Sequence, residues 1–460
     1  MMTQKTIIFF IFYCLTTIQL LAQYNIEKTL AFPDAEGFGK YATGARGHSI
    51  PTVYIVSNLN DSGEGSFREA VSQPGRFVLF AVSGIIHLQS NITVSPNTTI
   101  AGQTAPGTGI VLYGRKVSFT GASNSIIRHL RIRLGANAGA TKNDDASGIA
   151  NGKNIIFDHV SFSWGQDEVF SINWNMLGVE PDSITLQNCI IAQGLHIHNH
   201  SAGGLIQTQN GHISILKSLY ISNKTRNPKV KGYSEFVNNV IYNWGNSGNN
   251  YGHSVSGEGY IMGGSTGISK VNIINNYFIA GPNTPNKQSP FSRGTGTFHL
   301  YTSGNLFDNN KDGILDGVPV STNKYGFPGI SNSNFKKQAY QYPYNQGHLN
   351  TKDLLKWISR HAGATLPKRD DVDLLLIKEL NSIGQKGIFV FTEKDNKLSN
   401  GGLGIFESGN LPIDSDKDGI PDIWEKTIGS NPTKKDALEG STSHIGYLNI
   451  EVFINEMTAL

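Results

Sequence analysis

The most constraining feature of the sequence is a 29-residue repeat in the middle of the chain. Three apolar stretches follow it, and they read NIIFDHVSFSWG, SITLQNCIIAQG and HISILKSLYISN. Ile156, Thr185 and Ser214 occupy equivalent places in them, each 29 residues after the last. That period is too long for a hairpin and is typical of a solenoid in which each repeat forms one coil. Residues on adjacent coils then become neighbours in space.

Composition agrees with many short strands joined by tight turns. Gly makes up 52 of 460 residues, and no helical periodicity runs through roughly the first two thirds of the chain. Similar stretches extend from Asn91 to about residue 310, and Asn recurs at their turns. Asn tolerates the left-handed backbone conformation, and its amide can bond successive coils. The sequence therefore predicts an all-β solenoid with a structural asparagine ladder, to which we assign Asn188, Asn238, Asn239, Asn275 and Asn276.

The net charge limits the partners that the protein can bind, and the N-terminal sequence indicates the compartment in which it acts. A formal net charge of +3 gives no field that would favour nucleic acid or an anionic membrane, and we expect neither as a partner. One Lys, an apolar run and a short polar end make residues 1–22 a secretory signal peptide. We therefore expect a monomer exported to the periplasm or the medium, without membrane insertion. Cys189 is the single cysteine after the leader, so disulfides are excluded and we expect a small core residue.

The pattern divides the remaining chain in two. Residues 23–410 form the solenoid domain, with a cap at 32–90, coils at 91–310, and outer loops and helices at 311–410. We predict a short cap helix over 66–72 and two outer helices over 354–361 and 370–383. Residues 411–460 are predicted to be a separate small tail with one helix.

Several motifs, in this order and spacing, give the chain a family resemblance. They are AEGFGKYATGARG, DSGEGSFREAV, DDASGI, IIFDHVSFSWGQDE, TRNPK and NNVIYNWG. The chain resembles the secreted bacterial pectate lyases of polysaccharide lyase family 1 that carry a calcium-binding tail repeat. The resemblance covers nearly all of the mature chain. It implies a right-handed parallel β-helix and β-elimination of polygalacturonate with calcium.

The acids of the first coils suit such chemistry. Elimination requires that the uronate carboxylate be neutralised, and calcium is a hard cation that binds carboxylate oxygens. We predict that Asp144, Asp145, Asp167 and Glu168 supply its ligands. Asp145 and Asp167 open successive turns and can converge on one face, and the resemblance puts both on family ligand positions. Ser171 stands where many relatives carry another carboxylate, so either Glu168 compensates for it or calcium binds only once the substrate supplies oxygens.

The resemblance also assigns the base. Arginine is normally protonated, so the residue type alone suggests a carboxylate clamp at Arg226. In the family, however, the first Arg of Arg-x-Pro-x-x-Arg is taken as the proton-abstracting residue, and that position is Arg226. The last motif position is Lys231, so a bidentate clamp is lost there, although Lys229 and Lys231 can attract uronate carboxylates. His200 falls where relatives carry a basic residue that binds substrate, and we assign it that role.

Other polar and aromatic residues near these motifs receive structural roles. His196 and His198 are interpreted as incidental loop residues, and Asp158 and His159 as residues that brace a turn. Three tryptophans could either stack on sugar faces or belong to the core, namely Trp164, Trp174 and Trp244.

The tail carries an independent metal signal. The segment DSDKDGIPDIWE has the spacing of a calcium loop of EF-hand type, with Gly at the sharp turn. Its predicted ligands are Asp414, Asp416, Asp418, Ile420, Asp422 and Glu425. We expect this calcium to stabilise or attach the tail rather than to take part in chemistry.

Alternatives remain open from the sequence. Ser171 and Lys231 suggest a β-helical polysaccharide-binding or adhesin protein without catalysis, but such a binder has no need of Arg226 beside Asp145 and Asp167. A lyase for methylated pectin would prefer an aromatic cleft without calcium, and another uronan is a further possible substrate. Hydrolysis by paired carboxylates would leave Arg226 without a role.

Overall fold

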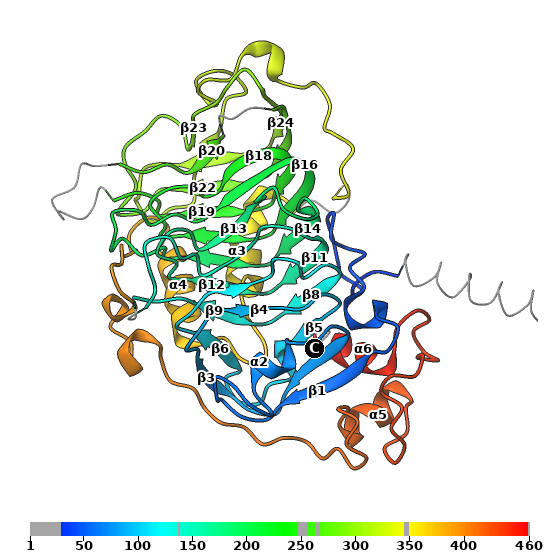
Figure 1. Ribbon diagram of the computed structural model, residues 1–460. Coiled ribbons are helices and arrows are strands. Elements are labelled where there is room, and N and C mark those ends of the chain that lie inside the picture. The colour runs from blue at the N-terminus through cyan, green and yellow to red at the C-terminus, as the bar shows by residue number, and fades with distance from the viewer. Residues whose placement is uncertain (1–28, 137–138, 247–255, 264–266, 345–348, 459–460) are drawn as a thin grey trace, which may run out of the picture.

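A computed structural model describes residues 29–136, 139–246, 256–263, 267–344 and 349–458, so the predicted signal peptide lies outside the described residues. The chain winds into stacked coils, and each coil adds one strand to each of three faces (Figure 1). Pairing between the coils is parallel throughout the named strands except between the last two. The predicted repeat is confirmed, because Ile156 pairs with Thr185 and Thr185 with Ser214. The fold is the predicted parallel β-helix.

The first face contains β1 and runs along the whole stack. Its strands are β1 (Thr52–Val56), β2 (Arg76–Phe80), β5 (Thr99–Ala101), β8 (Ser125–Arg128), β11 (Lys153–Asp158), β14 (Asp182–Gln187), β16 (Leu205–Leu216), β18 (Lys229–Val237), β21 (Ser269–Ile274) and β24 (Phe298–Ser303). β16 and β18 are long enough to bend into the second face as well, and each pairs with strands of both.

The second face consists of shorter strands. They are β4 (Ile92–Thr93), β7 (Val117–Ser118), β10 (Ser147–Ile149), β13 (Phe170–Asn173), the first halves of β16 and β18, β20 (Tyr260–Met262) and β23 (Phe291–Ser292). The third face is a ten-stranded sheet. It contains β3 (Gly84–His87), β6 (Ile110–Tyr113), β9 (Arg131–Arg133), β12 (Ser161–Ser163), β15 (Ile190–Ala192), β17 (Leu219–Ile221), β19 (Val240–Tyr242), β22 (Tyr277–Ile279), β25 (Leu306–Asp308) and β26 (Val318–Pro319).

The strands read as continuous apolar runs because both sides of the first and third faces are covered. In β2, Val78 and Phe80 point into the coil, whereas Phe77 and Leu79 pack outward against the C-terminal segment. Farther up the first face, the N-terminal segment lies across the outside, and Gly39 N donates to Thr185 Oγ1 at 2.8 Å.

Helices cover the remaining surfaces. α2 (Phe67–Ala70) lies at the first coil, where Phe67 is buried against Phe80, as expected for a cap. α3 (Thr351–His361) and α4 (Asp371–Leu380) pack on the third face through Leu354, Ile358 and Leu376. α5 (Asp422–Ile428) and α6 (Asn449–Glu456) lie beside β1 and β2 (Figure 1). The division into cap, coils, outer segment and tail stays a prediction.

Inside the stack, the asparagine ladder is confirmed for part of its predicted members. Asn239 donates through its side chain to Asn276 Oδ1 at 3.1 Å, and Asn276 donates to Asn305 Oδ1 at 2.8 Å. Asn188, Asn238 and Asn275 instead occupy the left-handed turn position, with φ of 51°, 57° and 52°. Cys189 is buried in the core as predicted, and burial raises the pKa of its thiol.

In the part of the chain that the structure describes, no helix is long and apolar enough to cross a membrane.

Candidate functional site

The candidate catalytic residues lie at the start of second-face strands in consecutive coils. Asp145 precedes β10, and Asp167 and Glu168 precede β13. His200 precedes β16, and Arg226 precedes β18. Isolated bridges join Glu168 to Ala202 and Ala202 to Thr225, so these coil edges are in register. Parallel stacking therefore brings together side chains that are distant in sequence.

Acids and bases contact one another along this edge. Nη1 of Arg226 is in contact with Oε1 of Glu168. Nε2 of His200 lies 2.9 Å from Oδ1 of Asp167 and 3.9 Å from Oε1 of Glu168. Asp145 receives a hydrogen bond from the Glu168 backbone N–H at 3.1 Å and pairs with Lys116 Nζ at 3.0 Å. We call Asp145, Asp167, Glu168, His200 and Arg226 the edge cluster.

The surroundings shift the pKa values of this cluster in different directions. Burial raises the pKa of Asp145, and Lys116 opposes that shift. The hydrogen bond from His200 is the main reason that the pKa of Asp167 is lowered. Burial lowers the pKa of Arg226 from its ordinary value, and the charge of Asp167 opposes this. Perturbed groups of both signs in one place are typical of a functional site.

A basic cavity of about 350 Å³ adjoins the edge cluster. Its lining includes His200, Lys224, Arg226, Lys287 and Arg293. The Glu258 carboxylate accepts hydrogen bonds from Nε of Arg293 at 2.5 Å and from its Nη2 at 2.8 Å. These two bonds orient the guanidinium of Arg293. The excess of basic side chains suits an anionic ligand.

Lys229 and Lys231 share the outer side of β18, because Val230 between them points into the core. Burial lowers the pKa of Lys229, and the charges of Arg226 and Arg293 lower it further. The predicted substrate-binding lysines thus lie on the strand that begins shortly after Arg226.

Two glycines allow the coil that carries His200 to pack closely against the backbone of the coils on either side of it. A Cβ on Gly203 would stand 2.6 Å from the Arg226 carbonyl oxygen. A Cβ on Gly204 would stand 1.9 Å from the Phe170 carbonyl oxygen. The backbone of Arg226 itself is left-handed, with φ of 56°, which is uncommon for a residue with a side chain.

Asp144, one of the predicted acids, and Ser171, which replaces an acid of the relatives, both have local partners. The Asp144 carboxylate accepts hydrogen bonds from the backbone N–H of Thr141 at 2.7 Å and from its hydroxyl at 3.0 Å, so it caps its own turn. It is not part of the compact group of Asp167, Glu168 and His200, whose ligand atoms lie within 4.8 Å of one another. Ser171 is buried, and its Oγ accepts the backbone N–H of Leu205. Its role is structural because it binds the neighbouring coil.

Burial shows which of the aromatic side chains and loop histidines belong to the core. Trp164 and Trp244 are buried in the core, so neither offers a face to a sugar. The interpretation of His196 as an incidental loop residue is wrong. Its ring is buried, with its centroid 4.1 Å from that of Phe389, a residue of the C-terminal outer segment. His196 therefore helps to attach that segment to the coils.

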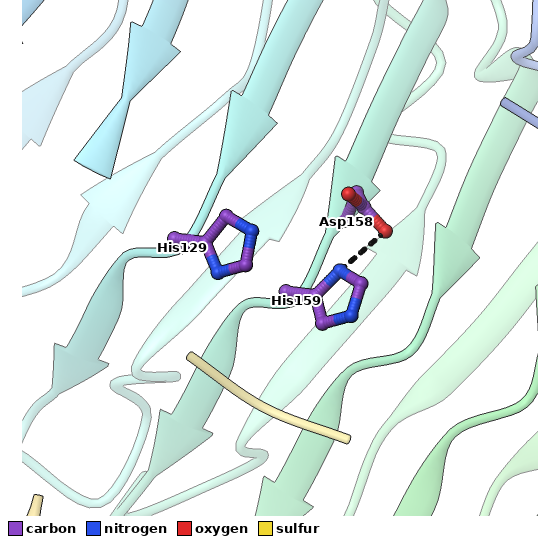
Figure 2. Close-up of side chains that lie close together, drawn as sticks. All are labelled: His129, Asp158 and His159. Atoms are coloured by element: carbon purple, nitrogen blue, oxygen red, sulfur yellow. Dashed lines mark hydrogen bonds and ion pairs between the residues drawn. The ribbon is translucent and has the colours of Figure 1, made fainter. Parts of the chain in front are cut away.

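A second cluster lies at the corner between the first and third faces. Figure 2 shows the rings of His129 and His159 beside each other, with Asp158 bonded to His159. Oδ1 of Asp158 also accepts from Gln187 and Asn188, and its Oδ2 accepts from Arg128. A carboxylate with four donors, one of them a buried arginine, is poorly suited to a metal. This agrees with the predicted bracing role.

The tail loop brings together most of its predicted ligands. Carboxylate oxygens of Asp414, Asp416 and Asp418 lie within 4.8 Å of one another, and so do those of Asp418, Glu425 and Asp436. Asp422 departs from the motif, because both of its oxygens accept hydrogen bonds from Ser415. Ile420, predicted to give its carbonyl, has its side chain buried between the tail and the coils.

The sequence interpretation missed several residues. Asp436 lies outside the twelve-residue loop, and Lys116, Lys287 and Arg293 belong to no motif, so spacing offered no signal for them. A signal was present in DNNKDGILDG, which begins at Asp308 and repeats part of the calcium-loop spacing. Its Lys311 and Gly313 share the positive φ of the corresponding tail residues. Within the described ranges, however, its three aspartates are not gathered into one ligand group.

Comparison with known proteins places the chain among relatives. No protein-family profile matches it. It is 47% identical over 428 residues to the probable pectate lyase C of Aspergillus flavus, covering 93% of this chain and 94% of the relative. It is 46% identical over 434 residues to the probable pectate lyase C of Aspergillus fumigatus, covering 94% of each. These relatives are fungal, so they support the family without supporting the expected bacterial branch.

Solved structures agree on the fold. The crystal structure of jun a 1, the major allergen from cedar pollen, gives a TM-score of 0.50 at 18% identity, covering 72% of this chain and 93% of that chain. The thermostable pectate lyase PL 47 gives 0.50 at 13% identity, covering 74% and 98%. By its identity to the curated relatives over almost its whole length, this chain belongs to the pectate lyase family.

Proposed function

We propose that the chain cleaves de-esterified α-1,4-linked polygalacturonate by calcium-assisted β-elimination and leaves 4,5-unsaturated oligogalacturonides. The observation that carries this proposal is the position of Arg226, which contacts the Glu168 carboxylate and lines a basic cavity. The 47% identity of this chain to a probable pectate lyase supports the same reaction.

Arg226 is the proposed base. An arginine serves in this role only when its neutral form is accessible, and burial of Arg226 lowers its pKa in that direction. Glu168 and Asp167 favour the charged form, so a cation that occupies these carboxylates would lower the pKa further.

The bonds of the reaction balance with one base. Arg226 takes the proton from C5 of the uronate, and the electron pair of that C–H bond forms the C4=C5 double bond. The bond between C4 and the glycosidic oxygen breaks, and that oxygen leaves with a proton from water. No oxidant or second nucleophile is needed.

Calcium fits the donor set of the edge cluster. Asp145, Asp167 and Glu168 would hold it, because carboxylate oxygens are the ligands that calcium prefers. Ligand atoms of Asp167, Glu168 and one imidazole lie within 4.8 Å of one another, and Asp145 adjoins them through its hydrogen bond from the Glu168 backbone. Each of these acids has a basic partner, namely Lys116, His200 or Arg226, so those partners compete for the same oxygens. When bound, calcium would neutralise the uronate carboxylate and make the adjacent C–H more acidic. Asp144 is kept as a weaker candidate ligand.

The remaining basic residues hold the substrate. Lys229 and Lys231 project from the outer side of β18 and would pair with carboxylates of successive sugar units. His200, hydrogen-bonded to Asp167, would bind substrate between that carboxylate and Arg226. The acidic polysaccharide is therefore the expected partner.

Beyond the lyase site, we propose the calcium-binding tail module over 411–460, export directed by residues 1–22, and a monomer. The tail proposal is supported by the acidic groups around Asp418, which fit calcium by their oxygen chemistry.

The test is the ultraviolet absorbance of the new double bond, measured on polygalacturonate with calcium and then with chelator. We expect a calcium-dependent rise with the natural chain, and for Arg226→Ala a fall in kcat of about 10²- to 10⁴-fold, the usual contribution of a general base. Arg360→Ala, an exposed arginine of α3, is the matched control and should keep full activity.

Absence of any rise on polygalacturonate, methylated pectin and other uronans, with binding intact, would refute the lyase function. That result would favour the non-catalytic polysaccharide-binding protein. A rise on methylated pectin alone, without calcium, would instead identify a pectin lyase.

A further inference from the structure

The acidic groups of the tail contain buried oxygens that lack partners. Glu425 is 0% exposed, and neither of its carboxylate oxygens has a hydrogen-bond partner. Oδ1 of Asp436 and Oδ2 of Asp416 are likewise buried and unpartnered. Among the ion pairs of the described residues, none involves these carboxylates or Asp418. Buried anions without compensation are costly, and a bound cation would compensate them.

Asp436 comes from outside the loop motif. It follows the loop's last residue, Glu425, after α5 and a turn, yet its carboxylate lies within 4.8 Å of Glu425 and Asp418. Its backbone N–H and that of Ala437 donate to Oδ2 of Asp418, at 3.0 and 2.7 Å. Asp422, which the motif would use, is engaged with Ser415 instead.

The segment at Asp436 is directly attached to α6. Nδ2 of Asn449 donates to the Asp436 carbonyl oxygen at 3.0 Å, and the backbone N–H of Ile450 donates to the Ala437 carbonyl oxygen at 2.9 Å. The first turn of α6 is therefore bonded to the residue that completes the acidic group.

The same helix is bound to the coils. Ile450 and Phe453 pack with Phe77 and Leu79 on the outer side of β2. Glu451 forms a buried ion pair with Arg46 at 2.6 Å. The loop itself also touches the first coil, since a Cβ on Gly419 would stand 2.9 Å from both Leu79 and Val53.

We propose that Asp436 is a ligand of the tail's calcium site, in the place the motif gives to Asp422, and that this calcium clamps the tail onto the first coils. The site consists of Asp414, Asp416, Asp418, Glu425 and Asp436. Without the cation, the carboxylates around Asp418 repel one another, and the Asp436 segment loses its position together with α6. This inference rests on the proposed calcium-binding tail and is independent of the lyase reaction.

The first test compares Asp436→Asn with Asp422→Asn in the full mature chain, by calorimetric titration of chelator-treated protein with calcium and no substrate. Asn at 436 can still accept the N–H that Asn431 donates to Asp436 Oδ2, so the fold is expected to survive. We expect Asp436→Asn to weaken calcium binding on the order of 10-fold or more, and Asp422→Asn to leave it nearly unchanged. The reverse order of the two variants would overturn the assignment of Asp436.

The second test measures hydrogen exchange of α6 with calcium and with chelator. At calcium about one hundred times its dissociation constant, opening of the tail should be suppressed about 100-fold. Glu425→Gln, which removes a buried charge while keeping the side chain's shape, should abolish the difference. Equal exchange with and without calcium in the natural chain would overturn the clamp. The absorbance assay on polygalacturonate is read separately, so failure of the lyase function would leave this result interpretable.

Discussion

Asn276 offers a direct measurement of what the asparagine ladder contributes. Its side chain is fully buried, and Oδ1 accepts from both the backbone and the side-chain N–H of Asn239, at 2.8 and 3.1 Å. Its Nδ2 donates to the Phe236 carbonyl oxygen at 2.9 Å and to Asn305 Oδ1 at 2.8 Å. Asn276→Ala removes all of these bonds and leaves the Asn239 backbone N–H buried without its acceptor.

The expected cost follows from these contacts. An orphaned buried N–H costs about 1–3 kcal/mol, and each further lost hydrogen bond contributes about 1 kcal/mol. One orphaned N–H and three further lost bonds together give about 4–6 kcal/mol for Asn276→Ala, which corresponds to roughly a 10³- to 10⁴-fold faster exchange where opening of the coil limits the rate.

Because a solenoid can open locally, native-state hydrogen exchange of β19 and β22 is the appropriate assay. The matched control is Asn275→Gly, one residue earlier in the same turn. Asn275 has φ of 52°, a conformation that Gly adopts freely, and among the described residues its side chain makes a single hydrogen bond, to the Leu349 carbonyl oxygen at 3.5 Å. Exchange that is unchanged in Asn276→Ala, or accelerated equally in Asn275→Gly, would refute the argument that buried amide bonds stabilise the coil.

Three further predictions concern function and pH. Because burial lowers the pKa of Arg226, the neutral guanidine increases as pH rises toward that pKa, so kcat/KM should rise with pH; a rate that falls from neutral to alkaline pH would contradict the base assignment. Lys231→Arg restores the forked donor and should lower KM without raising kcat, and an unchanged KM would separate residue 231 from substrate. Burial raises the pKa of Glu379 to about 8, so between about pH 4.5 and 8 the folded chain keeps a proton that the unfolded chain releases, and stability falls as pH rises. Glu379→Gln should therefore raise Tm at pH 8 and leave it nearly unchanged at pH 4; equal effects at both would contradict the raised pKa.

Much of the fold could be predicted from the sequence because a β-helix repeats in one dimension. The spacing of Ile156, Thr185 and Ser214 determines which residues pair between coils, since parallel stacking joins equivalent positions. The same regularity predicts that Asp145 and Asp167 lie on one face, and the strands that they precede, β10 and β13, pair with each other. The outer helices and the tail loop followed from local patterns that depend on a few adjacent residues.

Contacts between the coils and the segments folded back over them could not be predicted in this way. Burial of His196 depends on Phe389, and the acid that lies beside Glu425 from outside its own loop is Asp436. The pairing of Glu168 with Arg226 likewise depends on how far each turn projects from the stack. The sequence alone therefore determined the coil and its register, because these follow from a short-range period, while the candidate base came from the family resemblance. Only the tertiary structure decided which side chains meet, because that depends on the path of loops whose length and direction follow no period.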